Sequence, residues 1–131
     1  MKSLRISALL AAVIIGMPVS LMAQDVAVRS GLYSKALAFI KEAGASELAG
    51  REMGDIGKRK ATNLAVKSLA AMLWKDHERD TVALEKIVES KRAAFPPSPA
   101  FTEKIRLDVL RARSSGANFD QIYANDAVAQ Q

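Results

Sequence analysis

Apolar residues recur every three or four positions along most of this chain, which is the spacing of one face of an α-helix. The clearest run lies between Asn63 and Arg92, with apolar positions at Val66, Leu69, Ala70, Leu73, Leu84, Ile87 and Val88. No strand-like alternation of comparable length occurs. The pattern therefore predicts an all-α protein, with a helix over residues 64–93 and Asn63 as its N-cap.

A second helical pattern precedes this run, over residues 31–61, and Ser30 is its predicted N-cap. Its inward face consists of Leu32, Tyr33, Ala36, Leu37, Ile40, Ala43, Glu47, Gly50, Met53, Gly54 and Gly57, widened by Phe39, Leu48 and Ile56. A glycine inside a helix costs about 1 kcal/mol relative to alanine, so we expect a neighbouring helix to pack closely against such positions. They are Gly44, Gly50, Gly54 and Gly57. Only Thr62 and Asn63 separate the two patterns, so the helices must run antiparallel.

Two shorter patterns follow a stiff, proline-rich connector over residues 95–99. The third helix is predicted over residues 99–115, with Ser98 as N-cap. Its expected buried residues are Phe101, Ile105, Val109, Leu110 and Ala112. Gly116 has the character of a C′ residue that ends a helix.

Asn118 and Gln121 have the spacing of a capping box that opens a fourth helix. Its inward face is predicted to be Phe119, Ile122, Tyr123 and Ala127. This helix has only about three turns, far fewer than the first two. We therefore expect an up-and-down four-helix bundle with a short last helix. The apolar face left uncovered predicts a homo-oligomer or docking of a partner protein's helix.

The N-terminus resembles a secretory signal peptide over residues 1–23. Lys2 and Arg5 precede an apolar stretch over residues 6–15, and cleavage is predicted after Ala23. A flexible lead-in over residues 24–30 and the helical domain over residues 31–131 would follow. We expect export to the periplasm or cell envelope, with no membrane insertion after cleavage. The alternative is an uncleaved anchor over residues 6–23, although this stretch is near the lower length limit for a membrane span and is interrupted by a glycine and a proline.

Composition narrows the possible functions of this single domain of 131 residues. The absence of cysteine excludes disulfides, thiol chemistry and a lipid-attached cysteine. The net charge of +5 is mild and well mixed, and the few aromatic residues lie on apolar faces, so we expect no nucleic-acid partner. The basic residues 58–60 complement the negative end of the first long helix, and an anion site there is the alternative.

His77, the only histidine, occupies a position of the second long helix where an apolar residue is expected. One hypothesis is a mononuclear site in which His77, Asp80 and Glu47 bind a single divalent transition metal. The alternative is a buried His77 hydrogen-bonded to Glu47 or Tyr123, with no cofactor at all. A di-iron centre is not expected, since the Glu-x-x-His motifs it needs are absent.

No catalytic nucleophile motif or glycine-rich phosphate loop is present either, and we expect no enzymatic activity.

Several short motifs resemble a ferritin-like family of exported bacterial proteins known only as a domain of unknown function. They are Phe39, Ala43, the turn Ala61, Thr62 and Asn63, then Val66, Lys67, Ala70, Asp76, His77, and finally Phe119, Asp120 and Tyr123. The resemblance implies a ferritin-like fold and export, and members of this family are often described as outer-membrane or membrane-associated proteins. It implies no particular activity. The chain departs from the family at Gly50, where an acidic residue is common, and in its short fourth helix, which lacks a second histidine. We therefore expect a structural or interaction module, and the alternative is a periplasmic metal-binding domain.

Overall fold

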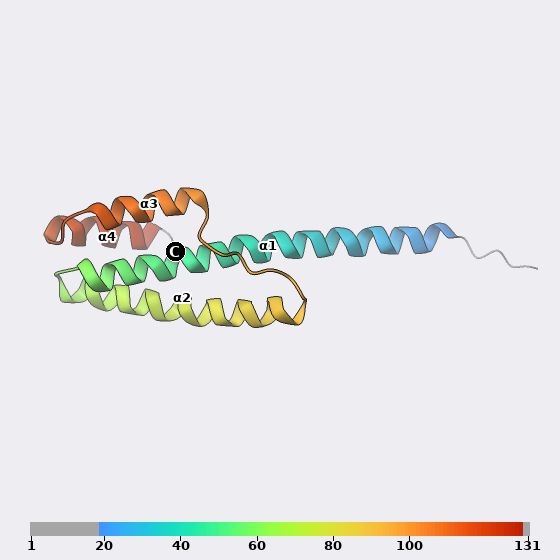
Figure 1. The fold of residues 1–131 in the computed structure, drawn as a ribbon, viewed down its shortest axis with the longest axis horizontal. Helices are drawn as coiled ribbons and strands as arrows, with labels where there is room; N and C mark the ends of the chain where they lie inside the picture. The colour runs from blue at the N-terminus through green and yellow to red at the C-terminus, as the bar shows by residue number, and fades with distance from the viewer. Residues whose placement is uncertain (1–18, 130–131) are drawn as a thin grey trace, which may run out of the picture. The chain divides into compact units, whose positions relative to one another are not determined.

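The computed structural model describes residues 19–129 of the chain. These residues form the helices α1 (Val19–Lys60), α2 (Leu64–Ser90), α3 (Phe101–Ala112) and α4 (Ala117–Ala129), as Figure 1 shows. Within this range there is no strand, which confirms the all-α prediction. The chain divides into two units, Met1–Leu32 and Tyr33–Gln131. None of the described helices is both long and apolar enough to cross a membrane.

The first helix begins at Val19, whereas the sequence pattern placed its start at Gly31. The prediction of Ser30 as N-cap was therefore wrong, and residues 24–30 are helical. The stretch from Val19 to Ser30 contains no glycine or proline and is rich in good helix formers, which override a serine that could have capped a later start. Most of the predicted signal peptide, residues 1–18, lies outside the described residues, and cleavage after Ala23 stays a prediction.

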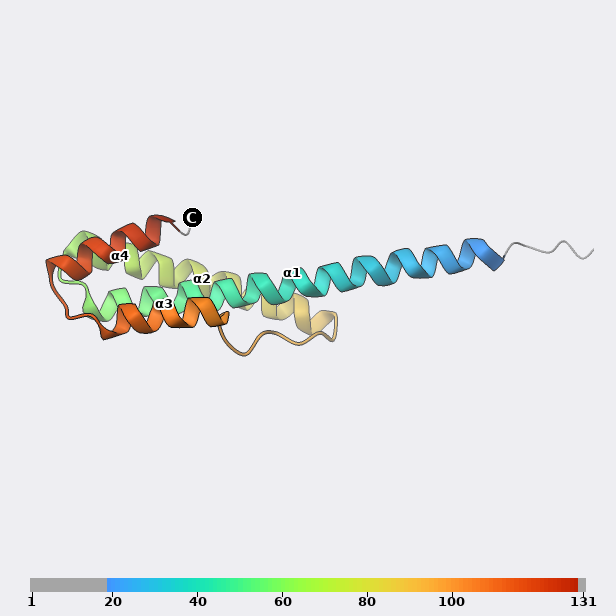
Figure 2. The same ribbon diagram turned by 90° about the horizontal axis from the view of Figure 1, so that it is seen from above.

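Helices α1 and α2 form an antiparallel hairpin, as predicted (Figures 1 and 2). Gly50 of α1 lies against His77, Gly54 against Trp74 and Gly57 against Ala70, so later residues of α1 meet earlier residues of α2. The side chain of Asn63 accepts hydrogen bonds from the backbone N–H groups of residues 65 and 66, at 2.8 and 3.4 Å, which confirms it as the N-cap of α2.

The C-terminus of α2 lies at Ser90, earlier than the predicted Ala93. Arg92 adopts a left-handed conformation with φ of 53°. Its N–H donates to Glu89 O at 3.0 Å, and the N–H of Ala93 donates to Val88 O at 3.0 Å. This is a Schellman motif, which glycine usually provides. The end of α2 was missed because an arginine occupies that position.

The start of α3 also differs from the prediction. Ala100 is its N-cap without any side-chain bond, and Ser98, the predicted cap, contacts Pro99 O instead. Gly116, with φ of +138°, accepts the hydrogen bond from Asp120 N–H that opens α4. The predictions of Gly116 as a C′ residue and Asn118 as a cap were therefore wrong. The pattern of apolar residues therefore predicts that a helix is present more reliably than the short polar segments at its ends predict where it begins and ends.

The buried face of α3 differs from the predicted one. Leu110 is buried, as predicted, and so is Leu107, whereas Phe101, Ile105 and Val109 are 76%, 51% and 52% exposed. Ala112 is exposed too. Both sets have helical spacing, so periodicity alone could not decide which face is turned inward.

Several apolar residues predicted to face inward are exposed at the end of the hairpin away from the turn between α1 and α2. On α1 the predicted inward residues Leu32, Tyr33 and Phe39 are exposed, and so is Ile87 near the end of α2. Ala36 on α1 is exposed as well. Helices α3 and α4 have 12 and 13 residues, against 42 in α1, and are too short to cover its whole length.

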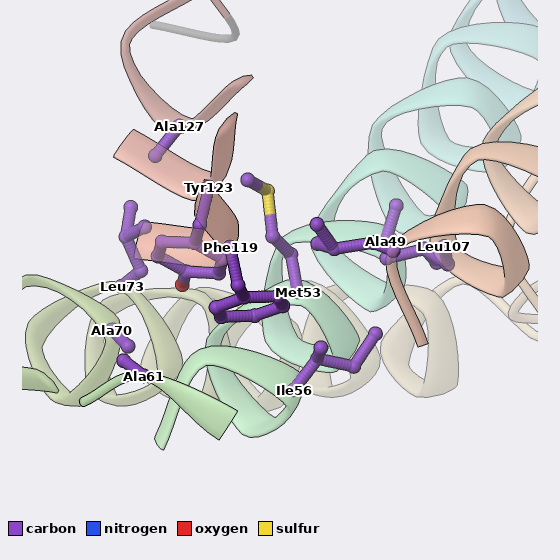
Figure 3. Close-up of a cluster of buried hydrophobic side chains, with 11 residues drawn as sticks. Ala49, Met53, Ile56, Ala61, Ala70, Leu73, Leu107, Phe119, Tyr123 and Ala127 are labelled. Carbon is purple, nitrogen blue, oxygen red and sulfur yellow. The ribbon is translucent and has the colours of Figure 1, made fainter. Parts of the chain in front are cut away.

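The core lies between the C-terminal half of α1 and the other three helices (Figure 3). It consists of Ala49, Met53, Ile56, Ala61, Ala70, Leu73, Leu107, Leu110, Phe119, Tyr123 and Ala127. The predicted inward face of α4 is confirmed, with Ile122 partly buried.

Of the four glycines at which a close neighbouring helix was predicted, Gly50, Gly54 and Gly57 lie against another helix, whereas Gly44 lies against the connector between α2 and α3. A Cβ at Gly54 would lie 2.6 Å from Trp74 N, and one at Gly57 would lie 2.6 Å from Ala70 Cβ. Residues Phe95 and Pro96 of the connector approach Gly44 in the same way.

Candidate functional site

Two groups of polar side chains could carry a function in the unit Tyr33–Gln131. One lies at the turn between α1 and α2, and the other lies farther along the same hairpin, around His77.

Asp120 of α4 binds the turn between α1 and α2. Its carboxylate accepts hydrogen bonds from Thr62 N at 2.9 Å, Thr62 Oγ1 at 2.6 Å and Asn63 N at 2.8 Å. The hydrogen bond from the Thr62 hydroxyl is the main reason why the pKa of Asp120 lies below its usual value. The side chain is 7% exposed. This carboxylate satisfies N–H groups at the start of α2, which is a structural task.

The aromatic pair of α4 completes this structural group. The rings of Phe119 and Tyr123 (Figure 3) stack with centroids 5.7 Å apart. Tyr123 also lies against Gly57 of α1. Burial raises the pKa of the Tyr123 hydroxyl, which has no hydrogen-bond partner among the described residues. The motif residues at the turn and at the start of α4 thus come together to close the bundle.

His77 contacts Glu47, as one of the two sequence hypotheses expected. Its Nδ1 lies 2.7 Å from Glu47 Oε2, a hydrogen-bond distance, and the two side chains are 30% and 22% exposed. The far edge of the imidazole lies against Gly50, where a Cβ would overlap the ring. Glycine at this position therefore makes room for the histidine. The hydroxyl of Tyr123, the other partner considered for His77, has no hydrogen-bond partner among the described residues.

Asp80, the third member of the predicted metal site, has a different contact. Its carboxylate accepts a hydrogen bond from Arg79 Nε at 3.0 Å. Across residues 19–129, no three histidine, cysteine or acidic side chains are grouped so that they could hold a metal ion. The structure brings Glu47 and His77 together but does not add Asp80 to them.

A cavity of about 550 Å³ lies beside the Glu47–His77 pair and was not predicted from the sequence. It is lined by Glu42, Ala45, Ser46, Ala49, Gly50 and Met53 of α1, Leu73 and His77 of α2, Ala100, Thr102 and Glu103 at the start of α3, and Ala127 of α4. Its walls are mostly small or apolar, with carboxylates at Glu42 and Glu103. The signal that could have indicated it is the run of small residues on α1, at Ala45, Ser46, Ala49 and Gly50.

The basic residues 58–60 at the end of α1 all have partners within the protein. Lys58 Nζ lies 4.1 Å from the centre of the half-buried Trp74 ring, a cation–π contact. Arg59 pairs with Asp55, and Lys60 donates to Arg111 O at 2.8 Å. These contacts, together with the helix dipole, account for the three charges without a bound anion.

Comparison with models of protein families matches residues 21–131 to a domain of unknown function, DUF4142. Neither the curated proteins nor the solved structures include a match to this chain.

Proposed function

The chain belongs to the DUF4142 family, whose function is unknown, and we propose that it is an exported, non-enzymatic interaction module of the periplasm or cell envelope. The charged, apolar and small-residue segments within residues 1–23 support export. The helix directions support a ferritin-like, up-and-down arrangement: α2 runs antiparallel to α1, and Asp120 at the start of α4 lies at their turn. Export and cleavage are tested by mass spectrometry of the exported product, which should begin at Gln24.

The observation that carries this proposal is the cavity beside His77. A helix about 10 Å wide with a pitch of 5.4 Å occupies about 420 Å³ per turn. A cavity of about 550 Å³ therefore has room for roughly one turn of a helix. Ala45, Ala49 and Gly50 line it, and such small side chains allow a second backbone to approach closely.

The charges around the cavity indicate the chemistry of the partner. Glu42 and Glu103 are its acidic lining residues, while Met53 and Leu73 provide apolar surface. An amphipathic helix with basic residues beside its apolar face would complement both features. We propose such a helix of a partner protein as the occupant.

The lack of native cysteines allows a direct test by thiol labelling in the cell envelope. Ser46→Cys places a thiol in the cavity, and Ser90→Cys places a matched control thiol on the exposed end of α2. A membrane-impermeant maleimide should label Ser46→Cys several-fold more slowly in intact envelopes than in the purified protein, and label Ser90→Cys equally in both. Adding Ala45→Trp, which fills the cavity, should remove the protection.

Equal labelling of Ser46→Cys in envelopes and in purified protein would contradict the proposal. Protection that appears in the purified protein as its concentration rises would instead identify a second copy of the chain as the occupant.

The second candidate function is binding of a single divalent transition metal by His77 and Glu47, the two members of the predicted site that lie together. The 2.7 Å approach of these two side chains supports it. The test is metal content and melting temperature with and without Zn²⁺, Cu²⁺ or Fe²⁺, for the wild type and His77→Ala. A ligand stabilises the folded state that binds it, so a site requires a rise in melting temperature that the variant loses. An equal change in the melting temperature of both proteins on adding metal would contradict a metal site at His77.

A further inference from the structure

Helix α3 carries apolar residues on two opposite faces. Leu107 and Leu110 belong to the core, while Phe101, Ile105 and Val109 point outward with exposures of 76%, 51% and 52%. The three outer residues are spaced by four and form one continuous ridge, which we call the α3 ridge. A helix that is apolar on both faces is typical of one that is covered on both sides. Nothing within residues 19–129 covers the α3 ridge.

The charges along one edge of this ridge are arranged for pairing with a copy of themselves. Lys104 and Asp108 lie one helical turn apart and carry opposite signs. In an antiparallel pair of identical helices related by a two-fold axis, each edge meets the same edge of the partner in reverse order. Lys104 of one copy then faces Asp108 of the other, and the reverse pair forms as well.

We propose that a second copy of this chain covers the α3 ridge, with the two α3 helices antiparallel and their ridges interdigitated. Ridges built from residues four apart favour a crossing angle near −50°. The Asp108 carboxylate is 71% exposed, so it is accessible to a partner even though it accepts a hydrogen bond from Arg111 Nη1 at 2.5 Å. Arg111 also pairs with Glu52 of α1 at 2.8 Å, which holds it away from the ridge.

The size of the ridge sets the strength of this dimer. Helix α3 has 12 residues and is therefore about 18 Å long. Two such helices bury much less than the roughly 800 Å² per partner of a stable interface. We therefore expect a weak and reversible dimer. This surface is separate from the cavity and does not depend on the function proposed for it.

Sedimentation velocity of the purified protein, from about 10 µM to 1 mM, tests the proposal over the concentrations at which a weak dimer forms. We expect a shift from monomer to dimer as the concentration rises. Ile105→Asp buries a charge in the centre of the pair and should weaken the dimer at least about tenfold. The matched control is Val128→Asp, because Val128 is 73% exposed on α4, outside the ridge. It should leave the dimer unchanged.

A charge exchange separates this arrangement from general stickiness. Lys104→Asp alone should weaken the dimer, because each new carboxylate faces Asp108 of the other copy. Combining Lys104→Asp with Asp108→Lys should restore it. Both substitutions are at exposed positions, so these variants should fold. They test the proposal even if circular dichroism shows that Ile105→Asp is unfolded. A protein that stays monomeric up to about 1 mM, or a dimer that survives both Ile105→Asp and Lys104→Asp, would overturn the proposal.

Discussion

The turn between α1 and α2 and the region around His77 are built from the same helices but differ in how completely they are packed. At the turn, Asp120 accepts three hydrogen bonds and the Tyr123 ring fills the space above Gly57. Around His77, one hydrogen bond to Glu47 lies beside a cavity of about 550 Å³. The difference fits the proposed division of tasks, in which the turn region stabilises the fold and the cavity region accommodates a partner's helix.

The largest expected contrast comes from two glycines that lie one helical turn apart on α1. A Cβ at Gly54 would lie 2.6 Å from Trp74 N and 2.7 Å from Trp74 Cα, and this backbone can move only if the two helices separate. Gly54→Ala should therefore lower the free energy of unfolding by about 3 kcal/mol, despite its better helix propensity. Denaturant titration measures this loss.

Gly50→Ala is the matched control for that substitution. The three atoms nearest to its Cβ would all belong to the far end of the His77 side chain, which can turn into the cavity. The gain in helix propensity of about 1 kcal/mol should offset the loss of the contact with Glu47, so stability should change little. Similar losses in both variants would show that the cavity region is as rigid as the turn.

A smaller loss is expected from Thr62→Val, which keeps the shape of the side chain and removes its hydroxyl. The bond from Thr62 Oγ1 to Asp120 is 2.6 Å long. A hydrogen bond to a charged group contributes about 1.5 kcal/mol or more, so we expect a loss of that size in thermal or denaturant unfolding. An unchanged stability would mean that the remaining two backbone donors suffice to hold α4 on the turn.

The same carboxylate predicts a dependence on pH. In the folded protein the pKa of Asp120 lies below the ordinary value of 3.8, chiefly because of the hydrogen bond from the Thr62 side chain. The unfolded state then binds more protons near that pH, so the stabilisation is complete above the unfolded pKa and is lost as the pH falls through the folded pKa. The wild type should therefore lose more stability than Asp120→Asn between pH 6 and pH 3, about the range in which carboxylates titrate, as measured by denaturant midpoints. If the stability of both proteins fell equally with pH, Asp120 would not be the source of the pH dependence.

The sequence predicted the hairpin better than the site, for physical reasons. Long helices repeat their apolar period many times, and Asn63 is a strong cap, so α2 and the glycine contacts of α1 could be derived from pattern and propensity. The approach of His77 to Glu47 followed from the antiparallel register. Which face of α3 turns inward depends on packing among distant segments, and periodicity does not contain that information.

The pairing of Asp120 with Thr62 and the cavity beside His77 have the same origin. Both depend on where α4 lies along the hairpin, and residues about 58 positions apart in sequence meet there. The Schellman motif at Arg92 was missed for a local reason, because its usual glycine is absent.

The smallest expected effect concerns the Tyr123 hydroxyl, which tests whether the turn region is purely structural. The ring is fully buried, and its oxygen has no hydrogen-bond partner in the described part of the chain. An unpaired buried hydroxyl opposes folding, so Tyr123→Phe should leave stability unchanged or raise it by about 0.5 kcal/mol. Phe119→Leu is the control that shows the sensitivity of the assay, since it removes the stacked ring and should cost about 1 kcal/mol. A loss on Tyr123→Phe as large as that of the control would mean that the hydroxyl has a partner such as a buried water, and the turn region would then contain a polar network of its own.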